Sequence, residues 1–337
     1  MSGHTSPAVG DPRARVGRFV LEVEGLKKYF SVRRGLLHRT RAQIRAVDGV
    51  SFALEPGETL CLVGESGSGK STVGRLVLRL IEPTEGSVRL DGHDITRLSR
   101  AEMRPWRKRA QIVFQDPYAS LNPRLTAGRI VAEPLENYPD TSGPEHAERV
   151  AWLFERVGLR PEMAGRFPFE FSGGQRQRLG LARALALNPS LIIADEPVSA
   201  LDVSVQAQVL NLMMDLQEDL KLAYLFISHD LGVVEHIGHR VAVMYLGRIV
   251  EISDKEKLFA RPLHPYTRAL LAAAPVPDPR AKKERIVLEG DIPSPMAPPS
   301  GCHFHTRCPF AFQRCRTEEP MLRDAGNGRL FSCHLDP

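Results

Sequence analysis

The chain has 337 residues, a hydrophobic fraction of 42% and a charged fraction of 25%, which is typical of an ordinary soluble globular protein. This length allows one large core, or a core with an appendage. No run of 18 apolar residues occurs, which excludes a membrane-spanning helix, and residues 1–17 lack the apolar segment of a secretory signal. We therefore expect a disordered tail over residues 1–17 and a protein that stays in the cytoplasm, where thiols remain reduced.

The net charge of +5 is mild for this length, but basic residues gather near the start of the chain. Residues 27–45 contain seven Lys or Arg and no Asp or Glu. This stretch predicts one basic patch. It is either a solvated hairpin or a contact for anionic lipid or nucleic acid.

Short apolar runs alternate with helical stretches along most of the chain. Strands are predicted over residues 19–24, 46–54, 59–63, 191–194 and 222–227, and a helix over residues 71–80. This alternation predicts an α/β fold with a parallel sheet.

The remaining segments suggest how the chain is divided. We expect one main domain over residues 18–260, with a helical subdomain inserted at about 117–171 that contains a helix over 145–157. Residues 261–300 are predicted to be a proline-rich linker, because seven prolines between 274 and 300 rule out a regular helix there. Residues 301–337, called the cysteine module below, hold four of the five cysteines.

Residues 64–71 (GESGSGKS) fit the phosphate-loop pattern G-x-x-x-x-G-K-[ST] and directly follow a predicted strand. In such a loop the glycines let backbone N–H groups converge on phosphate oxygens at the start of a helix. Lys70 is expected to bridge the β- and γ-phosphates of ATP, and the Ser71 hydroxyl to bind Mg²⁺. The residues assigned to nucleotide binding here are Gly64, Ser66, Gly67, Gly69, Lys70, Ser71 and Thr72.

An acidic pair ends a later apolar strand, at the sheet edge where the phosphate loop is expected. Asp195 is the predicted second Mg²⁺ ligand. Glu196, one residue further, is the predicted general base for the attacking water.

Residues 171–175 (FSGGQ) resemble the signature motif of ABC-type ATPases. The resemblance implies an antiparallel β subdomain beside the phosphate-loop core. It also implies that Ser172, Gly174 and Gln175 contact ATP held by another subunit, so that ATP is sandwiched at a dimer interface. His229, after the strand at 222–227, matches the switch histidine. Gln115 matches the Q-loop glutamine, which touches Mg²⁺ and the water.

Two further features follow from the same resemblance. Residues 199–202 (SALD) resemble the D-loop that meets the partner subunit. The adenine is expected to stack on an aromatic residue of the first hairpin, Phe30 or its neighbour Tyr29.

Beyond these motifs, the chain resembles the ATP-binding subunits of oligopeptide and dipeptide permeases over nearly its whole length. The residues that carry this resemblance are 115–124 (QDPYASLNPR), 263–267 (LHPYT), 292–295 (IPSP), 298–302 (PPSGC) and 305–309 (HTRCP). It implies a peripheral subunit on the cytoplasmic face of a bacterial inner membrane. Its expected partners are a second and different ABC ATPase, two transmembrane permeases and an extracytoplasmic substrate-binding protein.

The cysteines of the cysteine module follow the spacing C-x5-C-x6-C-x17-C, at Cys302, Cys308, Cys315 and Cys333. This spacing suggests a metal without naming it, since four thiolates suit Zn²⁺ or a [4Fe–4S] cluster. The family resemblance favours the iron–sulfur cluster over zinc or a metal-free module. Cys61 is expected to be core packing.

The resemblance implies an ATPase that powers the import of peptides through the permeases. Two other function classes compete with this one. An ABC ATPase acting on nucleic acid or the ribosome would usually contain long coiled coils or two cassettes, and this chain has neither, so no nucleic acid partner is expected. An inactive ATP binder is disfavoured because Glu196 and His229 are both present. The cargo stays open among dipeptides, longer peptides, nickel chelates and sugars, because a coupling ATPase does not touch it.

Overall fold

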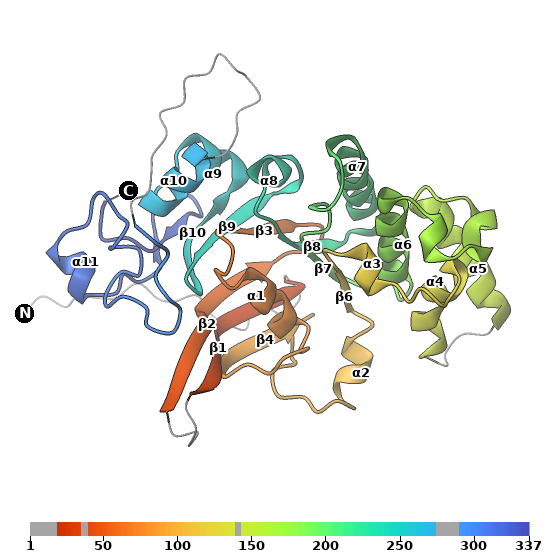
Figure 1. Cartoon of the computed structure of the whole chain (residues 1–337), viewed down its shortest axis with the longest axis horizontal. Coiled ribbons are helices and arrows are strands. Elements are labelled where there is room, and N and C mark those ends of the chain that lie inside the picture. The colour runs from red at the N-terminus through yellow and green to blue at the C-terminus, as the bar shows by residue number, and fades with distance from the viewer. Residues whose placement is uncertain (1–18, 35–39, 139–142, 274–289, 337) are drawn as a thin grey trace, which may run out of the picture.

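The computed structural model describes residues 19–34, 40–138, 143–273 and 290–336. The predicted tail at residues 1–17 and much of the predicted proline-rich linker lie outside these ranges. The described strands form two sheets, and helices flank the larger one (Figure 1).

The larger sheet has eight strands in the order β11-β12-β10-β9-β3-β8-β7-β6. Their bounds are β3 (Thr59–Val63), β6 (Ala110–Val113), β7 (Leu191–Asp195), β8 (Ala223–Ile227), β9 (Arg240–Tyr245), β10 (Arg248–Asp254), β11 (Arg323–Asp324) and β12 (Leu330–Phe331). The strands from β6 through β7, β8 and β3 to β9 are parallel. The strands β9, β10, β12 and β11 pair antiparallel. The prediction of a parallel sheet therefore holds for the five strands β6, β7, β8, β3 and β9 and was wrong for the other three, because the chain after β9 returns by a hairpin and later adds two short strands.

The smaller sheet is antiparallel, with the order β2-β1-β4-β5. Its strands are β1 (Leu21–Arg34), β2 (Thr40–Leu54), β4 (Glu85–Leu90) and β5 (His93–Asp94). This sheet confirms the predicted β subdomain. In the basic hairpin β1–β2, the Lys27 charge is partly neutralised by Glu85 at 2.6 Å, and the Lys28 ammonium donates to the Glu82 backbone carbonyl at 2.6 Å.

The helices fall into three groups along the chain. Near the first strands lie α1 (Lys70–Val77) and α2 (Met103–Trp106). Between β6 and β7 lie α3 (Pro117–Ser120), α4 (Ala127–Glu136), α5 (Gly143–Arg156), the 3₁₀ turns η2 (Pro161–Gly165) and η3 (Pro168–Glu170), and α6 (Gly173–Leu185). After β7 come α7 (Val203–Leu220), α8 (Leu231–Ile237), α9 (Lys255–Ala260), α10 (Pro265–Ala273) and α11 (Gln313–Thr317). The helices α4 to α6 extend from the sheet at the opposite end of the molecule from α11 (Figure 1).

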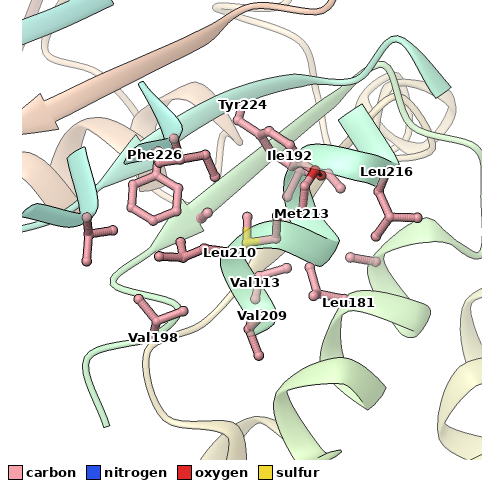
Figure 2. Close-up of a cluster of buried hydrophobic side chains, with 14 of the residues drawn as sticks. Val113, Leu181, Ile192, Val198, Val209, Leu210, Met213, Leu216, Tyr224 and Phe226 are labelled. Carbon is pink, nitrogen blue, oxygen red and sulfur yellow. Dashed lines mark hydrogen bonds between the residues drawn. The ribbon is translucent and has the colours of Figure 1, made fainter. Parts of the chain in front are cut away.

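Alternating residues of the central strands face two separate cores. Leu60 and Leu62 of β3 pack toward α1 and the smaller sheet, whereas Cys61 and Val63 pack toward the helices on the opposite face. Figure 2 shows part of this second core, where Ile192, Tyr224 and Phe226 of the sheet lie close to side chains of α7. Cys61 is fully buried there, which agrees with its predicted packing role. The short apolar runs within these strands explain why β3, β7 and β8 are predictable from sequence.

The cysteine module is part of the main fold. Its strand β12 pairs with β10 of the larger sheet, and its Phe304 joins the core. Phe304 and Phe331 are each 1% exposed, and burial of one phenylalanine contributes about 1.5–3 kcal/mol. The predicted linker was also wrong over residues 265–273, because α10 lies there with Tyr266 fully buried.

Candidate functional site

The phosphate loop joins β3 to α1, as predicted. Gly69 precedes α1 with a φ of 105°, and a Cβ at this position would lie 2.2 Å from the Ala46 carbonyl oxygen. Only glycine fits there. The first N–H groups of any helix have no partner within the helix, and at the end of a phosphate loop they form the arrangement that binds an anion.

Lys70 is folded back onto this loop. Its ammonium donates to the Gly64 carbonyl at 2.8 Å and to the Glu65 carbonyl at 3.0 Å. Burial lowers the pKa of Lys70, and the carboxylates of Glu196, Asp195 and Glu65 oppose this shift. A phosphate placed at this loop would favour the charged ammonium in the same way.

Ser71 and Asp195 form the predicted Mg²⁺ pair. The Ser71 hydroxyl donates to Asp195 Oδ1 at 2.9 Å, across the gap between α1 and the end of β7. Burial raises the pKa of Asp195, and the Ser71 hydrogen bond counters this shift. A hydroxyl and a half-buried carboxylate are hard oxygen ligands that suit Mg²⁺, and a bound Mg²⁺ would favour the charged form of the carboxylate.

Two predicted catalytic residues, Gln115 and His229, contact the same carboxylate oxygen of a third, Glu196. The Gln115 amide donates to Glu196 Oε2 at 3.0 Å, and His229 Nδ1 lies 3.1 Å from the same oxygen. Glu196 has a φ of 48°, in the left-handed region, which costs a non-glycine residue about 1–3 kcal/mol. Its backbone N–H donates to the Ile227 carbonyl at 3.0 Å, so β8 holds the strained residue in place.

The phosphate loop and the three predicted catalytic residues line a cavity of about 530 Å³. Its lining residues are Ile44, Ala46, Ser66, Gly67, Gly69, Lys70, Ser71, Thr72, Gln115, Glu196, His229 and Pro295. Three of these lining residues were not assigned to the site from sequence: Ile44, Ala46 and Pro295. Pro295 belongs to the quoted IPSP segment and accepts from the Arg45 N–H at 3.1 Å, a contact between distant segments that no local pattern signals.

The predicted adenine-stacking residues lie beside this cavity rather than in its lining. Phe30 is 40% exposed and pairs across the hairpin with Ile44, which does line the cavity. The Tyr29 hydroxyl donates to Asp48, and Arg45 lies over its ring. Burial raises the pKa of Tyr29 to about 12. Tyr29 is thus engaged elsewhere, and stacking of adenine on Phe30 stays a prediction.

The signature residues start α6. Ser172 caps the helix: its hydroxyl accepts from the Gln175 N–H at 3.3 Å, and its own N–H donates to Gln175 Oε1 at 3.0 Å. Gly174 allows α7 to approach closely, because a Cβ there would lie 2.3 Å from Val205. Within the described residues, none of these three lines the cavity above, so their contact with a partner's nucleotide stays a prediction.

The cysteine module brings its four thiols near one another. Each of Cys308, Cys315 and Cys333 is close enough to Cys302 that a thiolate charge there raises its pKa, and with burial the pKa of Cys302 reaches about 11. Even so, in the described part of the chain, which includes all four cysteines, no group of three or more His, Cys, Asp or Glu side chains is arranged to hold a metal ion. The thiols are free. The arrangement described therefore does not fit a metal as it stands.

The two-layer cassette, its phosphate loop and the acidic pair at the end of β7 define an ABC-type ATPase. The profile of the family described as "ABC transporter" matches residues 47–199, and that of "Oligopeptide/dipeptide transporter, C-terminal region" matches residues 250–315. Across the described helices, none has the length and apolar composition needed to cross a membrane.

Named relatives extend this match over almost the whole chain. A probable peptide ABC transporter ATP-binding protein of Sinorhizobium fredii is 60% identical, over 94% of this chain and 90% of that protein. The oligopeptide transport ATP-binding protein AppF of Bacillus subtilis is 56% identical, over 94% of this chain and 97% of that protein. The dipeptide transport ATP-binding protein DppF of Haemophilus influenzae is 52% identical, with the same coverage.

The fold of this chain is also similar to that of solved ATP-binding cassettes. The dimeric ATP-binding cassette MJ0796 bound to ADP and Pi has a TM-score of 0.61 at 31% identity, covering 70% of this chain and 98% of that one. The chain belongs to the ABC transporter family, among the ATP-binding proteins of peptide transporters.

Proposed function

We propose that this chain hydrolyses ATP to drive the import of peptides through partner membrane permeases. The observation that carries the proposal is the meeting of Gln115, Glu196 and His229 at one cavity with Lys70 and Ser71. The C-terminal region of the oligopeptide and dipeptide transporter type supports peptides as the cargo class.

Glu196 is the general base of the proposed reaction. As a water oxygen bonds to the γ-phosphorus, Glu196 takes a proton from that water. The bond from the γ-phosphorus to the oxygen that bridges the β-phosphate breaks, and ADP leaves with the electron pair. Gln115 and His229 hold the Glu196 carboxylate from two sides, so the base is oriented before ATP arrives.

Lys70, Ser71 and Asp195 bind the phosphate end of ATP. Lys70 exchanges its two loop carbonyls for phosphate oxygens, and Ser71 and Asp195 hold Mg²⁺. When bound by these two residues, Mg²⁺ would supply positive charge against the phosphates. The N-terminus of α6, with Ser172, Gly174 and Gln175, serves the nucleotide of a partner cassette.

The proposed assembly follows from this composite site and from the family. A second ABC ATPase, which we infer to be a different chain, supplies the signature residues for this site. Two permeases and an extracytoplasmic substrate-binding protein complete the importer, and the chain lies peripherally on the cytoplasmic face of the membrane. MJ0796, which has the same fold, forms a dimer.

We also propose that the four cysteines of the cysteine module bind an iron–sulfur cluster, with zinc as the alternative. Two observations support this. The four thiols lie within electrostatic reach of one another, and backbone N–H groups at Phe304 and Phe310 lower the pKa values of Cys302 and Cys308 against the effect of burial. Coordination requires these side chains to move from the positions described.

ATPase stimulation tests the proposed function. The complete transporter is purified with its native partners, reconstituted in nanodiscs, and assayed for phosphate release with the binding protein added empty or loaded with peptide. The proposal expects faster hydrolysis with the loaded binding protein and a flat response from a complex carrying Glu196→Gln. Hydrolysis that no peptide changes, but that a nickel chelate or a sugar accelerates, would contradict peptides as the cargo.

A further inference from the structure

An acidic residue lies inside the phosphate loop. Glu65 is the second residue of the loop, and its carboxylate is among the three that act on the Lys70 ammonium. A carboxylate within electrostatic reach of Lys70 is also within reach of phosphates bound to Lys70. An unpaired negative charge at this position would oppose the binding of a polyphosphate.

The cysteine module supplies the opposing charge. Arg307, 242 residues further along the chain, donates from Nη1 to Glu65 Oε2 at 2.8 Å and from Nη2 to Oε1 at 3.1 Å. This is the paired geometry in which a guanidinium holds a carboxylate most firmly. The Arg307 side chain is 8% exposed and that of Glu65 is 26% exposed, so bulk water screens the pair poorly.

A second contact holds the backbone of the same residue. The Glu65 N–H donates to the Tyr266 hydroxyl at 2.9 Å, and Tyr266 lies on α10. The Tyr266 ring packs against Tyr245 and Phe304, with ring centroids 4.7 and 5.4 Å apart. Phe304 comes from the cysteine module, so one buried aromatic cluster joins α10, β9 and this module beneath the phosphate loop.

We infer that Arg307 and Tyr266 are positioning residues of the nucleotide site, and that through Glu65 they set the affinity of the phosphate loop for ATP. Arg307 neutralises the carboxylate and fixes it away from the phosphates, and Tyr266 fixes the backbone of the loop at its second residue. The inference rests on the proposed binding of ATP at this loop. It gives the cysteine module a direct connection to nucleotide binding.

The two residues of the ion pair, Arg307 and Glu65, should have unequal effects on the affinity for ATP. Removing Arg307 leaves the Glu65 carboxylate without its partner beside the phosphates, which should weaken binding. Removing the Glu65 charge leaves Arg307 beside a loop that binds anions, which should not weaken binding. The loss caused by Arg307→Ala should therefore be reversed by Glu65→Gln in the same chain. A residue that only fastened the module to the cassette would show no such reversal.

The test measures the Kd for MgATP by isothermal titration calorimetry on the full-length chain, with the thermal midpoint recorded for each variant. We expect Arg307→Ala to weaken binding about tenfold, which is within the range typical of coupling between sites. The Arg307→Ala, Glu65→Gln double variant should bind within about twofold of Glu65→Gln alone, since the uncompensated charge is gone. Tyr266→Phe, which removes one oxygen atom, should weaken binding by a smaller factor at an unchanged thermal midpoint.

Two control variants distinguish positioning of the phosphate loop from attachment of the cysteine module to the cassette. Arg314→Ala breaks an exposed pair with Glu318 in the same module and should leave the Kd unchanged. Arg329→Ala breaks the link to the buried Glu251, which fastens the module to β10 without touching the phosphate loop. Its Kd should stay close to that of the wild type.

Three results would overturn the inference: an unchanged Kd for Arg307→Ala, a double variant no better than Arg307→Ala, or an equal loss in Arg329→Ala. A wild-type chain that does not bind MgATP would overturn the proposed function and this inference together. Wild-type binding with unaffected variants would overturn this inference alone.

Discussion

Glu196 shows how strain and contacts prepare a single residue for chemistry. It is held in a left-handed backbone conformation, and its Oε2 is shared by Gln115 and His229. The position of Glu196 after an apolar strand was enough to nominate it from sequence. Its strained backbone and the shared oxygen were not predictable, because they depend on β6 and β8 lying on either side of β7.

The first prediction concerns Glu196→Gln. We expect ATP binding to persist, because Lys70, Ser71 and Asp195 are untouched, while hydrolysis falls about 10²–10⁴-fold through loss of the general base. The measurement compares bound nucleotide and phosphate release in the reconstituted transporter. Glu148→Gln, an exposed position on α5, is the matched control and should behave as wild type. Turnover at the wild-type rate in Glu196→Gln would rule out the assigned role.

At the scale of elements, the segment before α10 contains a buried histidine that resists protonation. His264 is 1% exposed, its Nδ1 accepts from the Tyr266 N–H at 3.0 Å, and burial lowers its pKa to about 3. The folded chain therefore keeps this ring neutral over a range where the unfolded chain binds a proton. Protonation of the unfolded chain lowers the free energy of unfolding. This loss is negligible at about pH 7.5, sets in near pH 6.5 and grows as the pH falls toward 3.

We accordingly predict that the free energy of unfolding falls by about 1.4 kcal/mol between pH 7.5 and pH 5.5 through His264 alone. His303, whose pKa burial lowers to about 4, acts in the same direction. The contribution of His264 is thus the difference between wild type and His264→Gln in urea unfolding at the two pH values. An identical pH dependence in both proteins would contradict the assignment.

The cysteine module provides a third prediction. If the four thiols bind a cluster, anaerobically purified protein should be brown with about four iron atoms per chain, and Cys308→Ser should bleach it. Metal and sulfide analysis, together with the absorption spectrum, distinguishes an iron–sulfur cluster from zinc or no metal. Cys61→Ser is the control outside the module. Colourless protein with one zinc would support the alternative, and metal-free protein with a folded C-terminus would defeat both.

That third outcome is physically reasonable, because buried side chains and strand pairing join the cysteine module to the cassette without a metal. The sequence suggested 37 residues that fold apart from the cassette. The structure instead buries Phe304 and Phe331 against it and pairs β12 with β10. Strands of two residues have no detectable periodicity, and their pairing with a strand about 80 residues earlier has no local signal. The module was therefore recognisable by its cysteines alone and not by its place in the sheet.

At the scale of the whole molecule, we expect the phosphate loop and the signature helix to belong to different nucleotide sites. We predict that damage to the signature acts in trans. If the chain forms homodimers, a Ser172→Arg copy mixed with a Lys70→Ala copy should recover one composite site and part of the hydrolysis. In a transporter with two different ATPases this chain occurs once, and the mixture should recover nothing. Recovery in such a purified two-ATPase complex would contradict the trans geometry.

The architecture as a whole was predictable where local signals are strong. The phosphate loop, β3, β7, β8 and the helices between β6 and β7 follow from motifs and apolar runs. The connections from the C-terminal region to the nucleotide site were not predictable. Pro295 reaches the cavity and Arg307 reaches Glu65 only after the chain has folded back across the cassette.

The most direct test of the central claim is peptide uptake driven by ATP. The complete transporter is placed in proteoliposomes with the binding protein and a labelled peptide on one side and MgATP on the cassette side. Uptake is then followed for wild type and for the Glu196→Gln complex. We expect peptide to accumulate against its gradient with wild type and MgATP, and only to equilibrate without ATP or with Glu196→Gln. Equal accumulation in Glu196→Gln, or ATP hydrolysis with no accumulation of any peptide, would contradict it.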